Sequence, residues 1–224
     1  MLAIGIDGCR AGWIAVSIDD ADQRDFQIVP RIDRLAIIDN AMVFIDMPIG
    51  LPESGDRGCD LQARKQLGFA WPRVFIGLRR PLLRFTDYAA ANAWAKADGK
   101  GLAKQAFNIL PKIAEIDAFL SPARQNNFRE SHPELVFQRL NGRTALISKH
   151  KPAGLRARRD LLRAQGFKDI DDWSGKLRGS GAKVDDLYDA GVCALAARDA
   201  TGSRARCIDS GATDARGLHM QIWY

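Results

Sequence analysis

The chain has 224 residues, and we expect them to form one domain rather than two small ones. With 46% hydrophobic and 27% charged residues, it has the composition of an ordinary globular protein. No apolar run approaches the ~20 residues that span a bilayer, and no signal peptide is recognisable, so we expect a cytoplasmic protein without a membrane partner.

The first fifty residues have the pattern of strands. Residues 2–7 and 13–18 are separated by a short turn that contains glycines, which predicts an antiparallel hairpin. A third strand is expected at 26–29, ended by a proline, and a short helix at 32–39. Residues 42–46 are almost continuously apolar, which is typical of a strand covered on both faces in an α/β sheet.

The rest of the chain is mostly helical in pattern. We expect helices at 59–67, 86–96, 102–120, 133–140, 152–164 and 184–200, and short strands at 128–131, 205–209 and 220–223. Pro111 should end or kink the third of these helices. The fold class that fits this order is α/β, with a mixed sheet flanked by helices.

Two of the predicted strands each end in one aspartate, Asp7 and Asp46. A carboxylate at the end of a buried strand is costly unless its charge is used, although either residue alone also suits the start of a turn. Acids adjoin apolar residues again at 130–134 and 185–189. Four such places suggest one converging acidic site, whose usual ligand is a hard divalent cation such as Mg²⁺.

The formal net charge of +6 is concentrated in one segment. Residues 142–183 contain eleven lysines and arginines and four acids, a net charge of +7, so the rest of the chain carries −1. Such a local excess suits a polyanion-binding surface, although a solvated charged face gives the same pattern. The candidate residues for nucleic-acid binding are Lys100, Lys104, Lys149, His150, Lys151, Arg156, Arg158 and Arg159.

Six blocks of the sequence resemble the signature blocks of one family. They are GIDGCRAGW (5–13), IDMPIGLP (45–52), GKGLAKQAFNILPKI (99–113), ESHPE (130–134), SKHKPAG (148–154) and DDLYDAGVCALAA (185–197). The family is domain-of-unknown-function family 429, which is grouped with predicted nucleases of the ribonuclease H-like fold. The resemblance covers nearly the whole chain and implies one ribonuclease H-like domain over 1–224, with a sheet of five or more strands and a helical insertion around 52–125.

The resemblance also implies a set of catalytic acids. In ribonuclease H-like domains the first acid lies on strand one and the second at the end of strand four, which matches Asp7 and Asp46. A last acid on a late helix matches Asp189, with Asp186 three residues earlier on the same helix face. Glu130 is the best candidate for the remaining ligand. The expected metal ligands are Asp7, Asp46, Glu130 and Asp189, and the expected cofactor is Mg²⁺ or Mn²⁺.

The function that we expect is a metal-dependent nuclease that hydrolyses phosphodiester bonds of DNA or RNA. Two Mg²⁺ ions about 3.5–4 Å apart can neutralise the charge that develops on the attacking and leaving oxygens. A non-catalytic nucleic-acid-binding module is the first alternative, since a fold does not fix a function. An actin- or sugar-kinase-like phosphotransferase, with phosphate loops at 7–12 and 209–213, is the second. The sequence leaves a homodimer open.

Overall fold

The computed structural model describes residues 1–35 and 41–224, which form two compact units. The first unit contains residues 1–46, 127–207 and 223–224, and the second contains 47–126 and 208–222. The second unit thus includes the region of the expected insertion and, in addition, a C-terminal segment. Within the described residues no helix is long and apolar enough to cross a membrane.

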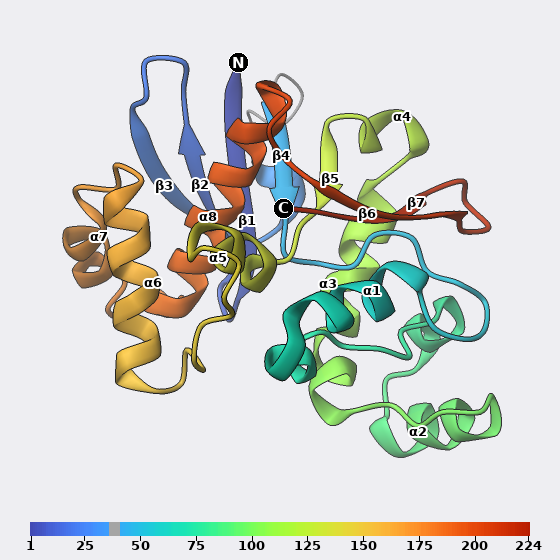
Figure 1. The fold of residues 1–224 in the computed structure, drawn as a ribbon. Coiled ribbons are helices and arrows are strands. Elements are labelled where there is room, and N and C mark those ends of the chain that lie inside the picture. The colour runs from blue at the N-terminus through green and yellow to red at the C-terminus, as the bar shows by residue number, and fades with distance from the viewer. Residues whose placement is uncertain (36–40) are drawn as a thin grey trace. The chain divides into compact units, whose positions relative to one another are not determined.

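A five-stranded mixed sheet forms the centre of the first unit (Figure 1). Its strands are β1 (Leu2–Cys9), β2 (Gly12–Ile18), β3 (Arg24–Val29), β4 (Ala41–Ile45) and β5 (Phe128–Glu130). The strand order is β3-β2-β1-β4-β5, with antiparallel pairs β1–β2 and β2–β3 and parallel pairs β1–β4 and β4–β5. The expected fold class, an α/β fold with a mixed five-stranded sheet flanked by helices, is confirmed, and the topology is consistent with a ribonuclease H-like fold.

One helix, α8 (Val184–Thr201), packs across the middle of this sheet, against β1, β2 and β4. All residues from Leu187 to Ala197 are buried, which explains why the segment is rich in alanine and lacks a polar face. Gly5 on β1 permits the contact. A Cβ atom there would lie 2.0 Å from the carbonyl oxygen of Ala190 and 2.1 Å from the amide nitrogen of Ala194. The helix backbone therefore rests directly on the strand backbone.

Three further helices of the first unit follow β5. They are α5 (Pro133–Leu140), α6 (Pro152–Ala164) and α7 (Ile170–Lys176), and Figure 1 shows α5 and α6 beside α8. The sequence pattern missed α7, which has only seven residues. Its buried Trp173 contacts Phe26 of β3 with ring centroids 5.3 Å apart, so tertiary packing stabilises this short helix.

The second unit is mainly helical. It contains α1 (Gly58–Leu67), α2 (Tyr88–Ala97), α3 (Lys104–Phe119), α4 (Pro122–Gln125) and 3₁₀ helices at Gly68–Arg73 and Arg80–Arg84. The strands β6 (Cys207–Thr213) and β7 (His219–Trp223) pair with each other in a two-stranded sheet. Arg80 joins these elements, since it pairs with Asp117 of α3 and with the buried Asp214 after β6.

Three local predictions differ from the structure. Pro111 lies inside α3 and does not end it, because the proline is exposed and the apolar face of α3 packs on both sides of it. Helix α2 begins at Tyr88, two residues later than predicted, and its cap is Asp87, whose carboxylate accepts the N–H of Ala90. The helix expected at 32–39 is a 3₁₀ turn over Ile32–Arg34, and residues 36–40 lie outside the described part of the chain.

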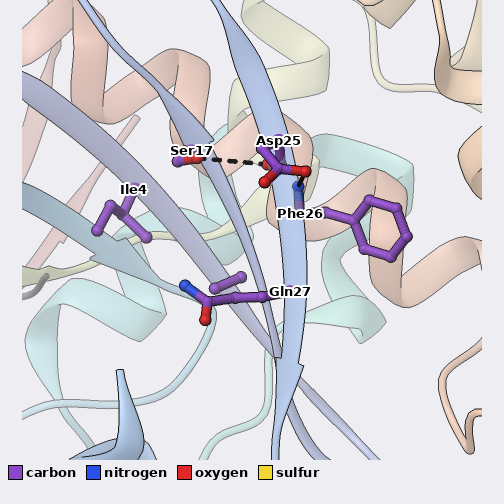
Figure 2. A pocket seen from close by; sticks show the side chains of 6 residues that line it. Ile4, Ser17, Asp25, Phe26 and Gln27 are labelled. Carbon is purple, nitrogen blue, oxygen red and sulfur yellow. Dashed lines mark hydrogen bonds between the residues drawn. The ribbon is translucent and has the colours of Figure 1, made fainter. Parts of the chain in front are cut away.

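The face of the sheet opposite α8 carries a small hollow of ≈ 190 Å³ (Figure 2). Strand register places Ile4, Ala15, Ser17, Asp25 and Gln27 on this face, and Phe26 completes the lining. Figure 2 shows the hydroxyl of Ser17 donating to the carbonyl of Asp25 across the hollow. The acids at the ends of β1 and β4 do not line it, so it is not the site that the sequence predicts.

The first prediction concerns the close contact between Gly5 and the backbone of α8. Gly5→Ala should lower the free energy of unfolding by about 3 kcal/mol or more, because the backbones of β1 and α8 must separate. The matched control is Gly175→Ala in α7, where a Cβ atom meets nothing within 4 Å. Since alanine favours helix over glycine, the control should be neutral or stabilising. Urea denaturation of both variants measures the difference, and equal stabilities would contradict the packing argument.

Candidate metal centre

The sheet register brings Asp7 and Asp46 together. Gly5 pairs with Phe44 in the parallel ladder between β1 and β4, so both residues face the same side of the sheet as α8. Asp7 and Asp46 each lie two residues further along and therefore face that side as well. The amide of Asp46 donates to the carbonyl of Ile6 at 2.9 Å, which extends the ladder to the level of the two acids.

The third acid comes from α8. Asp189 is buried one residue before Ala190, whose backbone touches the Gly5 position. One carboxylate oxygen from each of Asp7, Asp46 and Asp189 lies within 4.8 Å of the other two. Three segments that are far apart in sequence thus converge, as the sequence predicted for these three residues.

The three carboxylates have unusual electrostatics. Burial, together with the negative charges of Asp46 and Asp189, raises the pKa of Asp7 well above its usual value. Burial and the charge of Asp189 do the same to the pKa of Asp46. Burial raises the pKa of Asp189 to about 6, although the ammonium group of Lys149 opposes the rise. The cluster is therefore short of positive charge, which a cation would supply.

The oxygen atoms present fit a hard divalent ion. Asp7 uses one oxygen to accept the N–H of Gly8 at 2.6 Å, which fixes its carboxylate. Oδ1 of Asp189 is buried and has no hydrogen-bond partner among the described residues. A buried carboxylate oxygen without a partner is costly, and a metal ion would satisfy it. Three carboxylates without histidine or cysteine are a donor set that suits Mg²⁺ or Mn²⁺.

Lys149 also reaches the cluster, from the loop before α6. Its ammonium group donates to Oδ2 of Asp189 and lies 3.5 Å from Oδ2 of Asp185. Burial lowers the pKa of Lys149, but the carboxylates of Asp189 and Asp7 outweigh this effect and hold the pKa well above its usual value. The lysine is therefore charged, and it belongs to the acidic site rather than to an open cationic surface.

Asp185 and Asp186 lie at the start of α8. Asp186 accepts the backbone N–H of Lys183 at 2.8 Å, so it completes a capping box at the start of the helix. Asp186 is not one of the three convergent carboxylates, but it is near enough to raise the pKa of Asp7. A part in catalysis for Asp186 therefore stays a prediction, and helix capping is the role that the contacts define.

Glu130 is not part of the convergent group either. It pairs with Ile45 in the β4–β5 ladder, so its side chain leaves the sheet on the face opposite Asp46. The next residue, Ser131, points toward α8 and hydrogen-bonds Cys193 there. Glu130 remains close enough to raise the pKa of Asp46, so metal ligation by Glu130 stays an untested prediction.

The residues predicted to bind nucleic acid lie in different environments. Arg158 is fully buried and donates to both oxygens of Glu134, at 2.6 and 2.7 Å, so it is a core residue and not part of an exposed surface. Arg159 forms ion pairs with Asp160 and Asp171. His150, Lys151 and Arg156 are exposed.

The two remaining candidates lie in the second unit. Lys100 pairs with Asp56 at 3.0 Å, and the ammonium group of Lys104 lies 4.3 Å from the ring centroid of Tyr88. Both lysines thus have partners within their own unit. Their contact with nucleic acid stays a prediction, and these contacts make it less direct than for the exposed cations of the first unit.

Two features of the site escaped the sequence pattern. The first is the direct contact between Lys149 and Asp189, forty residues apart. The second is the buried pair of Glu134 and Arg158, which neutralises one of the acids beside the cluster. The signal for Lys149 was its position in the family block SKHKPAG, and Glu134 lies in the block ESHPE, but Arg158 lies in none of the six blocks. A charged residue in the sequence carries no information about the partner that it meets in the fold.

The fold and the site define an α/β protein with a buried carboxylate cluster suited to a divalent metal ion. A family model described as "Protein of unknown function (DUF429)" matches residues 5–213. The chain belongs to this family, the one that its sequence blocks resemble. A search of curated proteins and a search of solved structures each found no match to the chain.

The second prediction follows from the repulsion among the three carboxylates. Without metal, Asp7→Asn and Asp46→Asn should each raise the melting temperature, because each removes a buried charge that its neighbours repel. We expect at least the ~2–4 °C that 1 kcal/mol produces in a chain of this size. The control is Asp20→Asn, whose side chain is 86% exposed and should change little. Melting curves recorded in EDTA test this prediction, and a lower melting temperature than that of the wild type would assign the acids a structural role.

Proposed function

We propose that this protein is a metal-dependent nuclease that hydrolyses phosphodiester bonds of DNA or RNA. The observation that carries the proposal is the convergence of Asp7, Asp46 and Asp189 at the carboxyl ends of two central strands, with one oxygen of each within 4.8 Å of the others. Gly8 and Lys149 each satisfy one oxygen of Asp7 and Asp189, but these partners do not compensate the cluster. The pKa values of the three acids stay raised, and Oδ1 of Asp189 lacks a partner within the described chain.

The three aspartates would hold Mg²⁺ or Mn²⁺. When bound, such an ion supplies Lewis-acid stabilisation of the charge that develops on the oxygens of a phosphodiester during hydrolysis. The residues of this chain contribute rigidity. The hydrogen bond from Gly8 orients Asp7, and the backbone contact between α8 and β1 fixes Asp189 beside it. A preorganised ligand set needs little rearrangement when the substrate arrives.

A cationic loop adjoins this site and suits a polyanionic substrate. His150 and Lys151 are exposed and follow Lys149 directly in the chain, so their backbones lie within about 7 Å of a residue that contacts Asp189. Arg156 is exposed on α6, the helix that the loop enters. Lys151 and Arg156 have no ion-pair partner in the part of the chain that the structure describes, so both are available to phosphates. This surface supports a nucleic acid as the partner.

The phosphotransferase alternative has less support. Its second phosphate loop would be residues 209–213, but this segment lies in β6 and pairs with β7. A paired strand directs its amides to a neighbouring strand and cannot wrap around a phosphate. The non-catalytic binding module shares every feature of the nuclease except turnover, so an activity measurement separates these two functions.

The third prediction tests hydrolysis. Purified protein should cleave at least one of single-stranded DNA, duplex DNA, branched DNA and RNA when Mg²⁺ or Mn²⁺ is present, and none in EDTA. Asp7→Asn, Asp46→Asn and Asp189→Asn should each reduce the rate by ~10²-fold or more, because each removes a metal ligand. Asp20→Asn is the control and should retain activity. Binding of these substrates without cleavage under all conditions would assign the protein to the non-catalytic class.

The fourth prediction tests the cationic surface. Neutralising Lys151 and Arg156 together should reduce the slope of log affinity against log salt by ~1.4–1.8, because each phosphate contact contributes ~0.7–0.9. The matched control removes the same charge from Arg163 and Arg198, which already pair with Asp171 and Asp22. Fluorescence anisotropy of a labelled oligonucleotide at several salt concentrations gives the slopes. Equal slopes for the two double variants would mean that this surface does not contact phosphates.

A further inference from the structure

Lys149 places a positive charge in direct contact with the acidic site. The carboxylate of Asp189 has one oxygen, Oδ2, that accepts from the ammonium group of Lys149, while Oδ1 is buried without a partner among the described residues. The two oxygens thus have different environments. Oδ1 is available to an ion that Asp7 and Asp46 also bind, and Oδ2 already has a positively charged partner.

The charges of the buried site support one ion rather than two. Asp7, Asp46 and Asp189 together carry three negative charges, and Lys149 carries one positive charge, so one divalent ion makes the group neutral. A second divalent ion would leave a net positive charge in a buried place, which is costly. Two other buried acids, Glu130 and Glu134, lie near enough to raise the pKa of Asp46. Arg158 already neutralises Glu134 through both of its oxygens, and Glu130 leaves the sheet on the opposite face, so neither is placed to offset a second ion.

The loop that carries Lys149 is fixed, so its contact with Asp189 is not the chance position of a flexible surface chain. The buried guanidinium group of Arg158 donates to the carbonyl of Ile147 at 3.0 Å and to that of Gly154 at 2.8 Å, which ties the loop to α6. Gly154 permits this, since a Cβ atom there would lie 2.1 Å from the carbonyl oxygen of Ser148. The residues on both sides of Lys149 are thus held, and only about a quarter of its side chain is exposed.

We propose that Lys149 replaces one metal ion of a two-ion site, so that the acidic site of this protein binds a single divalent ion on Asp7, Asp46 and Oδ1 of Asp189. This inference rests on the proposed metal-dependent function and changes its expected stoichiometry, since the sequence alone suggested two ions. Lys149 then serves to balance charge and to orient Asp189.

The experiment, the fifth prediction, counts bound ions. Isothermal titration of the full-length protein with Mn²⁺ should give one ion per chain for the wild type. Lys149→Met keeps a similar side-chain length and removes the charge. It should bind the first ion at least about tenfold more tightly, or accept a second ion, because a repelling positive charge has gone. At the same time its hydrolytic rate should fall by about 10²-fold, because Asp189 loses the ammonium group that orients it.

Two further variants keep the result interpretable. Lys168→Met is the matched control, because Lys168 is exposed between α6 and α7, and its ion stoichiometry and affinity should equal those of the wild type. Lys149→Arg keeps the charge and should still bind one ion. If Lys149→Met does not fold without metal, Mn²⁺ should rescue its melting transition, and Lys149→Arg then provides the stoichiometry.

Different outcomes separate this inference from the proposed function. A wild type that binds two ions, or a Lys149→Met variant with unchanged stoichiometry and affinity, overturns the one-ion site while the metal-dependent nuclease stands. A wild type that binds no ion and cleaves no substrate overturns the proposed function itself. Tighter or additional ion binding together with slower hydrolysis in Lys149→Met supports the one-ion site.

Discussion

The contact between the backbones of β1 and α8 is the constraint on which the rest of the site depends. It exists because residue 5 is a glycine and because α8 presents Ala190 and Ala194 where they meet the strand. Two stacked sheets, for comparison, lie ~10 Å apart because side chains fill the space between them. At Gly5 no side chain separates the strand from the helix, so Asp189 reaches the level of Asp7 and Asp46 and the three carboxylates form one group.

This geometry places charge where folding alone would not favour it. Like charges are buried together, and the pKa values of the acids are raised. Ionisation of these acids therefore lowers the free energy of unfolding of the metal-free protein. Proteins commonly keep such unfavourable local arrangements at functional sites, where binding of a ligand restores the loss. Lys149 offsets part of the charge from within the chain. The site is thus partly neutral before any ion binds, which suits ion binding that is reversible and selective.

The cations of the basic segment at 142–183 divide into buried and exposed residues. Arg158 lies in the core, where it neutralises Glu134 and fixes the loop that carries Lys149. Lys151 and Arg156 lie on the surface and keep their charges available to solvent. The same net charge therefore includes a core residue that holds the site and exposed cations, which we proposed as contacts for a nucleic acid. Counting charges along the sequence cannot separate the two groups, because burial distinguishes them.

The sequence by itself determined the strands, most helices and the acids Asp7 and Asp46 by local rules, and the family resemblance added Asp189. Short apolar runs bounded by turns form strands, and the acids that end two of them must face one edge if the strands are parallel neighbours. Tertiary structure decided the rest. Packing on Phe26 stabilised α7, and the ladder directed Glu130 away from the cluster while Ser131 faced α8. The contact of Lys149 with Asp189 and the burial of Arg158 join segments distant in sequence, and no local pattern records which partner a charged residue will meet in the folded chain.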